Sequence, residues 1–291
     1  MTGQQQTAPN QAQAELWNGP AGRNWVEQNA LLDRLLAPLV PPLVEAVGRQ
    51  GARAVLDVGC GAGGSTFAIA ESLDRQGRCT GLDISAPLID LARRRAAELE
   101  IDNADFLVAD VQQHAFTPES FDAIISRFGV MFFDDPVIAF ANLRAAARPD
   151  AGLACIAWRG TAENAFMTAA ERAAAPLLPE PPPRAPNAPG QFAFADADYV
   201  AGILAKAGWR GVDLRPLDVA CEISAEDLEI YAVRMGPVSL ALPGLEPDHR
   251  EAVIAAVKAG FAPFVTDGVA RFTAACWMVT GRALSGHSLA T

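Results

Sequence analysis

The sequence lacks the patterns that mark several common kinds of site. It has only three histidines and two tyrosines among 291 residues. Its five cysteines form no CxxC pair, and no His/Cys cluster has the spacing of metal ligands, so we expect no metal site. The scattered cysteines lie mostly in apolar runs, which is typical of buried thiols in a reducing, cytoplasmic compartment.

Basic charge and long apolar runs are also scarce. Lys and Arg number 23 against 34 Asp and Glu, which gives a net charge of −11. A field of that sign repels nucleic-acid phosphates and anionic lipids, and the densest basic cluster, ARRRAAELE at 92–100, is predicted to be a solvated helix face. No apolar run is long enough to span a membrane, and the polar start has no signal-peptide core. We therefore expect neither a nucleic-acid nor a membrane partner.

Strand-like and helix-like segments alternate through the middle of the chain. Strands are predicted at 54–58, 79–82, 105–108, 123–126 and 153–158, with helices at 65–73, 87–99 and 136–147 between them. Continuous apolar strands joined by helices indicate a parallel sheet covered on both faces. A ligand is then expected at the carboxyl ends of the strands.

The flanking segments divide the chain further. Residues 1–14 are predicted to be a disordered tail, 15–50 a helical N-terminal cap, and 51–160 the α/β core. The proline-rich stretch 175–190 is a long loop of the kind that forms lids, binding loops or linkers. Residues 161–291 add predicted helices at 196–207, 225–235 and 247–259, and strands at 212–219 and 271–280.

A glycine-rich turn follows the first predicted strand, in the stretch AVLDVGCGAGGSTFAIA at 54–70. Glycine permits a close approach of a ligand to the backbone, and the following helix presents free N–H groups. The spacing Gly59-x-Gly61-x-x-Gly64, with Asp83 about twenty positions on, fits a dinucleotide site. The stretch from Asp57 to Gly63, with the same Asp83 binding ribose hydroxyls, fits a methyl-donor site. A tight turn without a ligand is the third interpretation.

Two carboxylates favour the methyl donor. Asp57 ends a buried strand two positions before the first glycine, where an unpaired charge is costly. The α-ammonium of a methionine moiety would pair with it, whereas a pyrophosphate would be repelled. Asp110, in LVADVQ, is placed to accept a hydrogen bond from adenine N6, with the Val111 N–H facing ring nitrogen N1.

Several motifs together resemble the class I S-adenosylmethionine-dependent methyltransferases, in particular the small-molecule branch similar to quinone-biosynthesis methyltransferases. The resemblance covers about residues 17–282 and is carried by WNGPAGRNW, VLDVGCGAGGST, GLDIS, ADVQ, FDAIISRFGVMFFDDP and LRAAARPDAGL. It implies a Rossmann-like, doubly wound α/β sheet of seven strands with the last one antiparallel. It also implies S-adenosyl-L-methionine as the cofactor, and a substrate lid built from insertions after the fifth and sixth strands.

One turn departs from the family's pattern. Before the fifth strand the family usually carries two glycines, whereas this chain reads RPDAG at 148–152. Asp150 is expected to tolerate a left-handed conformation there, with Gly152 taking part of the strain.

The resemblance also assigns the donor site. Cofactor-binding residues are expected at Trp17, Trp25, Asp57, Gly59, Gly61, Gly63, Asp83, Ile84, Asp110, Val111, Ser126 and Arg127. The two tryptophans either hold the sulfonium by cation–π attraction or staple the N-terminal helix to the core. Arg127 either points at the carboxylate of the donor or of an acidic substrate, or pairs with Asp134 or Asp135.

The acceptor should lie beyond the fourth strand. Substrate-binding residues are expected at Phe128, Met131, Phe132, Trp158, Phe192 and Tyr199. Such a lining predicts an apolar or aromatic acceptor, although at least two of the apolar residues after the fourth strand are expected to be core. Methyl transfer from a sulfonium needs alignment more than it needs a catalytic group. His114 is the candidate base, against the alternative of a solvated loop histidine.

The sequence thus predicts an enzyme that moves a methyl group to a small metabolite by in-line displacement. The alternatives are an NAD(P)-dependent oxidoreductase and a non-catalytic protein that binds S-adenosylmethionine. The oxidoreductase is disfavoured because neither tyrosine, Tyr199 or Tyr231, has a lysine four residues on. The identity of the acceptor and the methylated atom are left open, as is the choice between a monomer and a homodimer.

Overall fold

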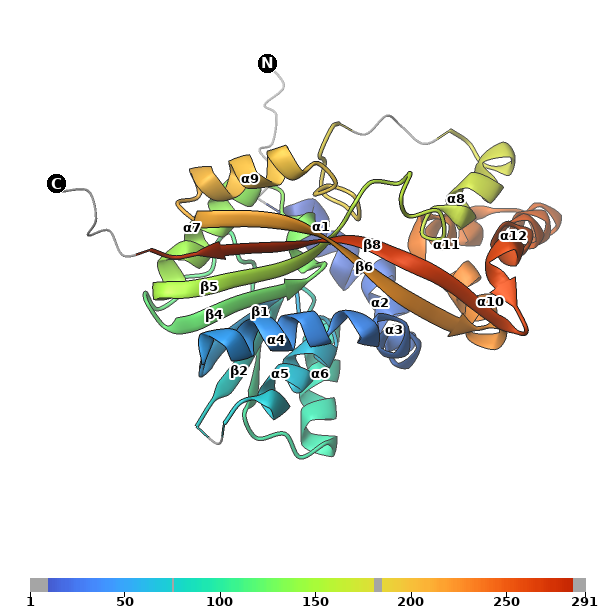
Figure 1. Cartoon of the computed structure of the whole chain (residues 1–291). Helices are drawn as coiled ribbons and strands as arrows, with labels where there is room; N and C mark the ends of the chain where they lie inside the picture. Colours follow the sequence, from blue (N-terminus) through green and yellow to red (C-terminus); the bar gives the residue numbers. More distant parts are fainter. Residues whose placement is uncertain (1–9, 75, 181–184, 285–291) are drawn as a thin grey trace, which may run out of the picture.

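A mixed sheet forms the centre of the molecule (Figure 1). The computed structural model describes residues 10–74, 76–180 and 185–284. The strands are β1 Ala54–Val58, β2 Arg78–Asp83, β3 Ala104–Val108, β4 Phe121–Arg127, β5 Ala147–Trp158, β6 Arg210–Ser224, β7 Val265–Thr266 and β8 Val269–Arg282. Their spatial order is β3-β2-β1-β4-β5-β8-β6, with β7 paired to β8. Neighbours from β3 to β5 are parallel, and β8 is antiparallel to β5 and β6.

Helices cover both faces of this sheet, as Figure 1 shows. The α-helices are α1 Gln11–Asn18, α2 Pro20–Glu27, α3 Asn29–Leu36, α4 Pro41–Gln50, α5 Gly64–Ser72, α6 Ala86–Glu98, α7 Pro136–Ala146, α8 Ala169–Ala174, α9 Ala197–Lys206, α10 Ala225–Arg234, α11 Gly236–Ala241 and α12 Pro247–Phe261. Short 3₁₀ turns are η1 Ala37–Leu39, η2 Gly129–Phe132, η3 Ala175–Leu177, η4 Leu242–Gly244 and η5 Ala262–Phe264. Helices α4, α5 and α6 lie on one face, and α7 and α9 lie on the other.

Local chemistry explains where the core helices begin. Ser85, Asp135 and Asp196 each accept a backbone N–H of the first turn, which caps α6, α7 and α9. The strands β1 and β4 contribute apolar side chains such as Val55, Leu56 and Ile125, all fully buried, to the core. Apolar strands buried on both faces are what a parallel sheet requires, so the predicted doubly wound α/β fold with an antiparallel last strand is confirmed. The two-residue β7 is an addition to the predicted seven strands.

The strands β6 and β8 extend beyond the rest of the sheet as a two-stranded ribbon. The residue Trp158, which ends β5, pairs with Cys276, whereas β6 follows β8 as far as the pair Ser224 and Val269. Helices α8, α10, α11 and α12 gather on the far part of this ribbon, at the right of Figure 1. We call the ribbon and these helices the arm. Within the described residues, no helix is long and apolar enough to cross a membrane.

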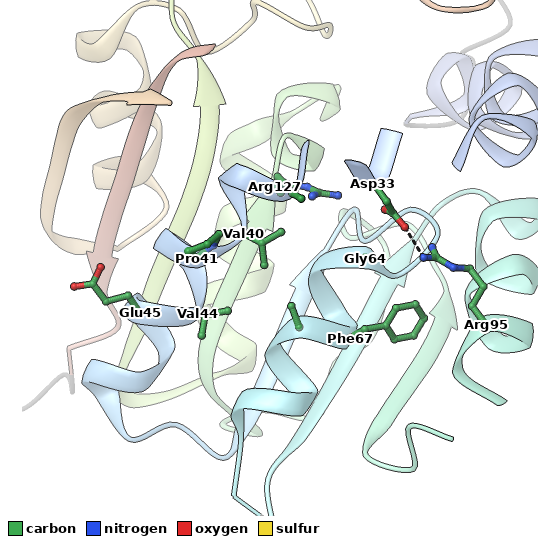
Figure 2. A pocket seen from close by; sticks show the side chains of 11 residues that line it. Asp33, Val40, Pro41, Val44, Glu45, Gly64, Phe67, Arg95 and Arg127 are labelled. Atoms are coloured by element: carbon green, nitrogen blue, oxygen red, sulfur yellow. Dashed lines mark hydrogen bonds and ion pairs between the residues drawn. The ribbon is translucent and has the colours of Figure 1, made fainter. Parts of the chain in front are cut away.

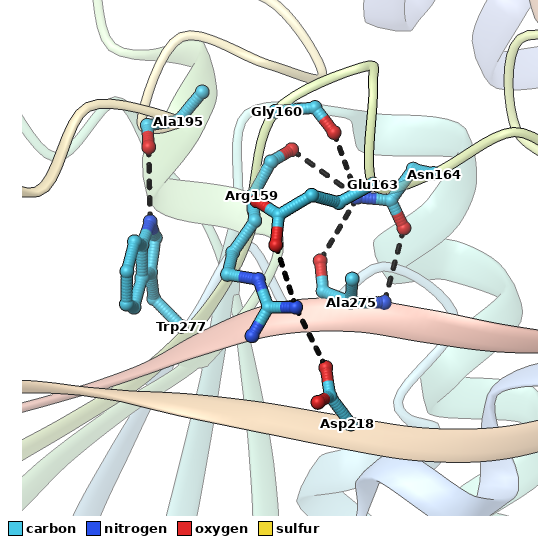
Figure 3. Close-up of polar contacts among 8 residues, drawn as sticks. All are labelled: Arg159, Gly160, Glu163, Asn164, Ala195, Asp218, Ala275 and Trp277. Carbon is cyan, nitrogen blue, oxygen red and sulfur yellow. Dashed lines mark hydrogen bonds and ion pairs between the residues drawn. The ribbon is translucent and has the colours of Figure 1, made fainter.

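A buried amide joins the arm to the sheet where β5 ends (Figure 3). The side chain of Asn164, 1% exposed, donates to the carbonyls of Arg159, Gly160 and Ala275 and accepts the Ala275 N–H at 3.0 Å. It therefore continues the β8 ladder after β5 has left. Beside it, the Arg159 guanidinium pairs with Glu163 and with Asp218 of β6, each at 2.8 Å.

The structure corrects several expectations. Residues 11–14, predicted to belong to a disordered tail, are helical because α1 begins at Gln11; residues 1–9 lie outside the described part. Residues 181–184 of the proline-rich loop also lie outside it. The stretch 148–152, predicted to be a turn before the fifth strand, lies within the first part of β5, and there Asp150 alone takes the left-handed conformation, with φ 63°. Gly152 serves instead to make room for Gln50, whose Oε1 accepts the Gly152 N–H at 3.1 Å.

Candidate active site

The glycine turn, residues 59–64, crosses the carboxyl end of the sheet between β1 and α5. Gly59, Gly61 and Gly63 have φ values of 67°, 57° and 87°, a region that favours glycine. A Cβ on Gly59 would lie 2.6 Å from the Cα of Gly129, so this glycine lets the turn pack against the segment that follows β4. The turn is thus shaped by packing at Gly59 and is open at Gly61, where a Cβ would meet nothing within 4 Å.

Asp57 is fully buried at the end of β1, as its place in the sequence predicted. Its Oδ2 accepts hydrogen bonds from the hydroxyls of Ser65 and Thr66, both at 2.7 Å, while its Oδ1 has no partner among the described residues. Burial raises the pKa of this carboxyl, and the two hydroxyls and the more distant Arg127 offset part of that rise. Sequence reasoning missed Ser65 and Thr66, although both stand in the quoted motif. The partnerless Oδ1 is an acceptor that a bound cationic group would satisfy.

Asp83 lies at the end of the neighbouring strand β2. Its two oxygens accept the backbone N–H groups of Gly61 and Ser85, each at 2.9 Å, so it ties the glycine turn to the start of α6. Burial raises the pKa of this carboxyl to about 6. Each carboxylate oxygen has a further lone pair, so both remain able to accept a ligand hydroxyl.

The N-terminal helices α1 and α2 cover the carboxyl ends of β2 and β3. Asn10, at the start of α1, donates to the Asp110 carboxylate at 3.1 Å, and Gln113 donates to its other oxygen at 2.8 Å. Asn18 bonds the backbone on both sides of Ser85, and the Ser85 hydroxyl donates to the Trp17 carbonyl. Asp110, which was predicted to recognise adenine, therefore accepts a hydrogen bond from Asn10, a residue of the predicted disordered tail.

Aromatic side chains meet beneath these helices. Trp17 packs edge-on against Trp25 and Phe132, with ring centroids 5.7 Å and 5.1 Å apart. Trp25 lines the cavity at the glycine turn, where a contact with a bound ligand is geometrically open to it. The contacts of Trp17 fit the alternative in which a tryptophan packs the N-terminal helices onto the core. Phe128, at φ 67°, stacks on Trp158 at 4.4 Å. Both stacked rings are buried, and of the two Phe128 lines the cavity at the glycine turn.

The remaining predicted residues divide into core and periphery. Met131 is buried, and its sulfur accepts the backbone N–H of Trp158 at 3.4 Å. The Ser126 hydroxyl donates to the backbone carbonyl of Val58, and the Val111 backbone carbonyl accepts from the Asn142 side chain. These hydrogen bonds hold both residues in place. Phe192 and Tyr199 are half-buried against the core, Tyr199 on α9. Ile84, by contrast, offers its carbonyl to Asn18 of the N-terminal helices.

His114 lines neither of the two cavities described below, although its backbone N–H donates to the Asp110 carbonyl at 2.8 Å. Its ring packs edge-on against Phe116 at 4.5 Å, and Phe116 in turn packs against Phe121 at 6.4 Å. Phe121 begins β4, so this cluster lies toward the amino end of a strand whose carboxyl end carries the site. The catalytic role of His114 stays a prediction without support from this geometry.

Arg127 ends β4 and separates two cavities. Its guanidinium donates to the Leu36 carbonyl at 3.2 Å and forms no ion pair with Asp134 or Asp135, which was one predicted alternative. The Asp135 carboxylate instead accepts the Ile138 N–H at the start of α7. Burial lowers the pKa of Arg127, and Asp33 and Asp57 counteract that shift from a distance.

The smaller cavity lies at the glycine turn and measures about 40 Å³. Trp25, Leu32 and Leu36 of α2 and α3 line it, which is why it is so small. The larger one, about 640 Å³, lies between α4 and α5 (Figure 2). The two share Asp33, Gly64 and Arg127.

An ion pair holds α3 over the turn. Asp33 pairs with Arg95 of α6, whose guanidinium also donates to the Ala62 carbonyl at 2.6 Å. Arg95 belongs to the basic cluster that was predicted to be a solvated helix face. For Arg95 that prediction is wrong, since its side chain is only 20% exposed.

Part of the chain that carries the candidate site is similar to a known protein family. Residues 55–150 match the family model described as a methyltransferase domain. This segment is similar to methyltransferase domains. It contains Asp83, Asp110 and Arg127 together with the glycine turn. The resemblance drawn from the sequence motifs is confirmed.

Two curated relatives are similar to part of the chain. Aklanonic acid methyltransferase DauC of Streptomyces sp. strain C5 is 38% identical over 88 residues, which are 30% of this chain and 40% of that protein. Demethylmenaquinone methyltransferase of Lactiplantibacillus plantarum is 31% identical over 103 residues, 35% of this chain and 44% of that one. The chain thus spans less than half the length of these two relatives.

A solved structure shares the fold. Phosphoethanolamine N-methyltransferase 2 of Haemonchus contortus, in complex with S-adenosyl-L-methionine, superposes with a TM-score of 0.50 at 15% identity. The match covers 84% of this chain and 53% of that one.

Proposed function

We propose that the protein is an S-adenosylmethionine-dependent methyltransferase that acts on a small apolar or aromatic metabolite. The observation that carries the proposal is the pair of buried carboxylates, Asp57 and Asp83, on either side of the glycine turn at the ends of β1 and β2. A buried, partnerless oxygen beside a tight turn is costly in a protein that binds nothing there. The methyltransferase domain, and relatives named for aklanonic acid and demethylmenaquinone, support a small organic acceptor.

The residues present suit the donor. Asp57 Oδ1 would accept the methionine ammonium, and the Asp83 carboxylate would accept the ribose hydroxyls. The Asp110 carboxylate has acceptor capacity left beside its bonds from Asn10, Gln112 and Gln113, so it would accept the adenine amino group as well. When bound, S-adenosylmethionine supplies a methyl group on a positively charged sulfur, which needs little further activation.

The chain's own contribution is alignment and exclusion of water. Phe128, backed by the stacked Trp158 ring, would present an apolar surface to an aromatic acceptor at the glycine-turn cavity. Helices α1–α3 would close over both ligands, and a water-free, well-oriented pair accounts for most of the rate of such a displacement. No step in this scheme requires His114.

Donor binding requires the N-terminal helices to move. A cavity of about 40 Å³ is far below the roughly 300–1,000 Å³ of ordinary small-molecule sites. Opening means displacing α3 and separating Asp33 from Arg95. We therefore infer that the described arrangement is the closed state of this cap.

Thermal unfolding tests the donor site. Saturating S-adenosylhomocysteine, at about 100 times its Kd, should stabilise the protein by about 2.7 kcal/mol, a shift of several degrees. Asp83→Asn should abolish the shift, and Asp102→Asn, an exposed carboxylate on the loop before β3, should preserve it. A shift with NAD⁺ alone would instead favour the oxidoreductase.

Turnover then separates an enzyme from a binding protein. Naphthols and hydroxyquinones incubated with S-adenosylmethionine should release S-adenosylhomocysteine, detected by chromatography. Donor binding without release across the acceptor panel would favour the non-catalytic alternative. The cytoplasmic location and the monomeric or homodimeric state stay predictions.

A further inference from the structure

The larger cavity is a groove beside the glycine turn, and the donor contacts proposed above leave most of it unused. Its volume of about 640 Å³ falls within the range of small-molecule sites. Val40, Pro41 and Val44 at the start of α4 line one side, and Phe67 and Ala68 of α5 line the other (Figure 2). The walls are therefore apolar, and they suit the body of an organic molecule.

Four charged side chains also line this groove, and three of them already have partners. Asp33 and Arg95 pair with each other, and Glu45 pairs with Arg49 at 3.0 Å. Arg127 differs. Within the described part of the chain, its one hydrogen bond goes to the Leu36 carbonyl, and no carboxylate lies within ion-pair distance. Asp57, the other nearby acid, is held by Ser65 and Thr66.

An arginine in this position calls for an anion. The guanidinium carries five N–H donors in a rigid fork and does not lose its charge in proteins. One carbonyl satisfies one of these donors, and Asp33 and Asp57 act on the charge only from beyond ion-pair distance, so the described residues leave this half-buried guanidinium without a hydrogen-bonded anion. A carboxylate matches the fork with two parallel hydrogen bonds, which makes it the best-fitting single partner.

We propose that the α4–α5 groove binds a small molecule with an apolar body and one carboxylate, and that Arg127 receives the carboxylate. The acceptor proposed above lies against Phe128, which does not line this groove, so binding in the groove does not rest on the proposed function. The donor's own methionine carboxylate is a second source of the same chemistry, because Arg127 also lines the glycine-turn cavity. The experiment must separate the two sources.

Calorimetric titration of the full chain with 2-naphthoate provides the test, with 2-naphthamide as the neutral analogue of the same shape. Naphthoate should bind at least roughly tenfold more tightly than the amide, the size of effect expected for hydrogen bonds to a charged group. Saturating S-adenosylhomocysteine should change the naphthoate affinity by less than twofold. Equal affinities for the two probes, or no naphthoate binding at 10 mM, would overturn the proposal.

Three variants locate the site. Arg127→Met should weaken naphthoate binding tenfold or more, whereas Arg215→Met, the same change at an exposed arginine of β6, should leave it unaltered. Ala68→Phe should block the groove while Arg127 is intact. Circular dichroism establishes whether each variant folds. If Arg127→Met does not fold, Ala68→Phe still tests whether naphthoate binds in the groove. Naphthoate binding that survives both Arg127→Met and Ala68→Phe would overturn the assignment.

Competition separates this proposal from the previous one. Displacement of naphthoate by S-adenosylhomocysteine would give Arg127 to the donor carboxylate and overturn the groove assignment. Naphthoate binding without any S-adenosylhomocysteine binding would support the groove and count against the proposed methyl transfer.

Discussion

The two ends of the central sheet handle charge in opposite ways. At the ends of β1 and β2, Asp57 and Asp83 are buried and held by hydroxyl and backbone donors. Along the ribbon of β6 and β8, Arg271 and Glu222 face water, with side chains 57% and 71% exposed and 3.6 Å apart. Solvated pairs contribute little, whereas buried carboxylates are costly unless they are used. The difference marks the first end as the site and the second as a support.

That support depends on a few buried polar contacts rather than on its surface charges. Asn164 and Arg159 lie where the arm leaves the sheet, and both are at least nine-tenths buried. Substituting one buried polar group in each region should therefore have a large effect, whereas substituting an exposed charged residue should have a small one.

The largest effect should follow Asn164→Ala. This change removes an amide that reaches three carbonyls and accepts the Ala275 N–H, leaving buried backbone groups without partners. We expect a loss of about 3 kcal/mol in the free energy of unfolding, measured by urea denaturation. Glu163→Gln, on the same turn but half-exposed, should cost less than about 1 kcal/mol. Equal losses for the two variants would show that Asn164 is not the joint.

The next effect is a pH dependence of donor affinity at Asp83. Folding raises the pKa of this carboxyl from 3.8 to about 6, so the free folded protein holds the proton more tightly than the unfolded chain. This group therefore makes the fold less stable as the pH rises from about 4 to 6. Ribose hydroxyls that donate to the carboxylate require its ionised form, so donor binding should weaken as the pH falls below about 6.

Calorimetry with S-adenosylhomocysteine measures this dependence. Affinity at pH 5 should be about tenfold lower than at pH 7, one pKa unit being a factor of ten. Asp83→Asn should bind weakly and lose the pH dependence. A wild-type affinity that is flat between pH 5 and 7 would remove Asp83 from the donor site.

The same contrast decides how much the sequence could predict. Strands of the core were located closely, β1 at its very bounds, because short apolar runs between glycine and proline signals define buried parallel strands. The positions of Asp57, Asp83 and the glycine turn at the ends of β1 and β2 could be predicted because they depend on short stretches of sequence. The ribbon's length was underestimated, since the exposed residues of β6 alternate without a continuous apolar run.

Contacts between distant segments were beyond sequence reasoning. Asn10 meets Asp110 across 100 positions, and Asp33 meets Arg95 across 62. Nothing in a polar N-terminal stretch or in a run of arginines specifies which residue turns inward, because that choice is made by the packing of helices. For the same reason the sequence suggested His114 as a base, while the fold places its ring against Phe116.

A smaller effect should follow Asp33→Asn. Helix α3 touches both regions: Asp33 pairs with Arg95 of the core, and the adjacent Arg34 pairs with Asp227 of the arm at 2.7 Å. Weakening the core pair should let the cap open more often, so S-adenosylhomocysteine should associate roughly two- to fivefold faster, as expected when opening gates entry.

Stopped-flow tryptophan fluorescence measures this association rate through Trp25, which lines the cavity. Arg34→Gln, whose side chain is 61% exposed, is the matched control and should leave the rate unchanged. Faster association in both variants would mean that α3 opens as a unit with the arm.

The smallest effect is expected from Arg271→Gln on the ribbon. Its pairing with Glu222 spans two adjacent strands at 3.6 Å, with both side chains largely in water. The attraction between two such charges is offset by their hydration and by the freedom they lose, so the free energy of unfolding should change by less than about 0.5 kcal/mol. Urea denaturation at low salt and at 1 M NaCl provides the measurement, because salt screens exposed pairs and spares buried ones. A loss of more than about 1 kcal/mol that disappears in high salt would show that the ribbon's surface charges do stabilise the arm, and the two ends of the sheet would then differ in degree rather than in kind.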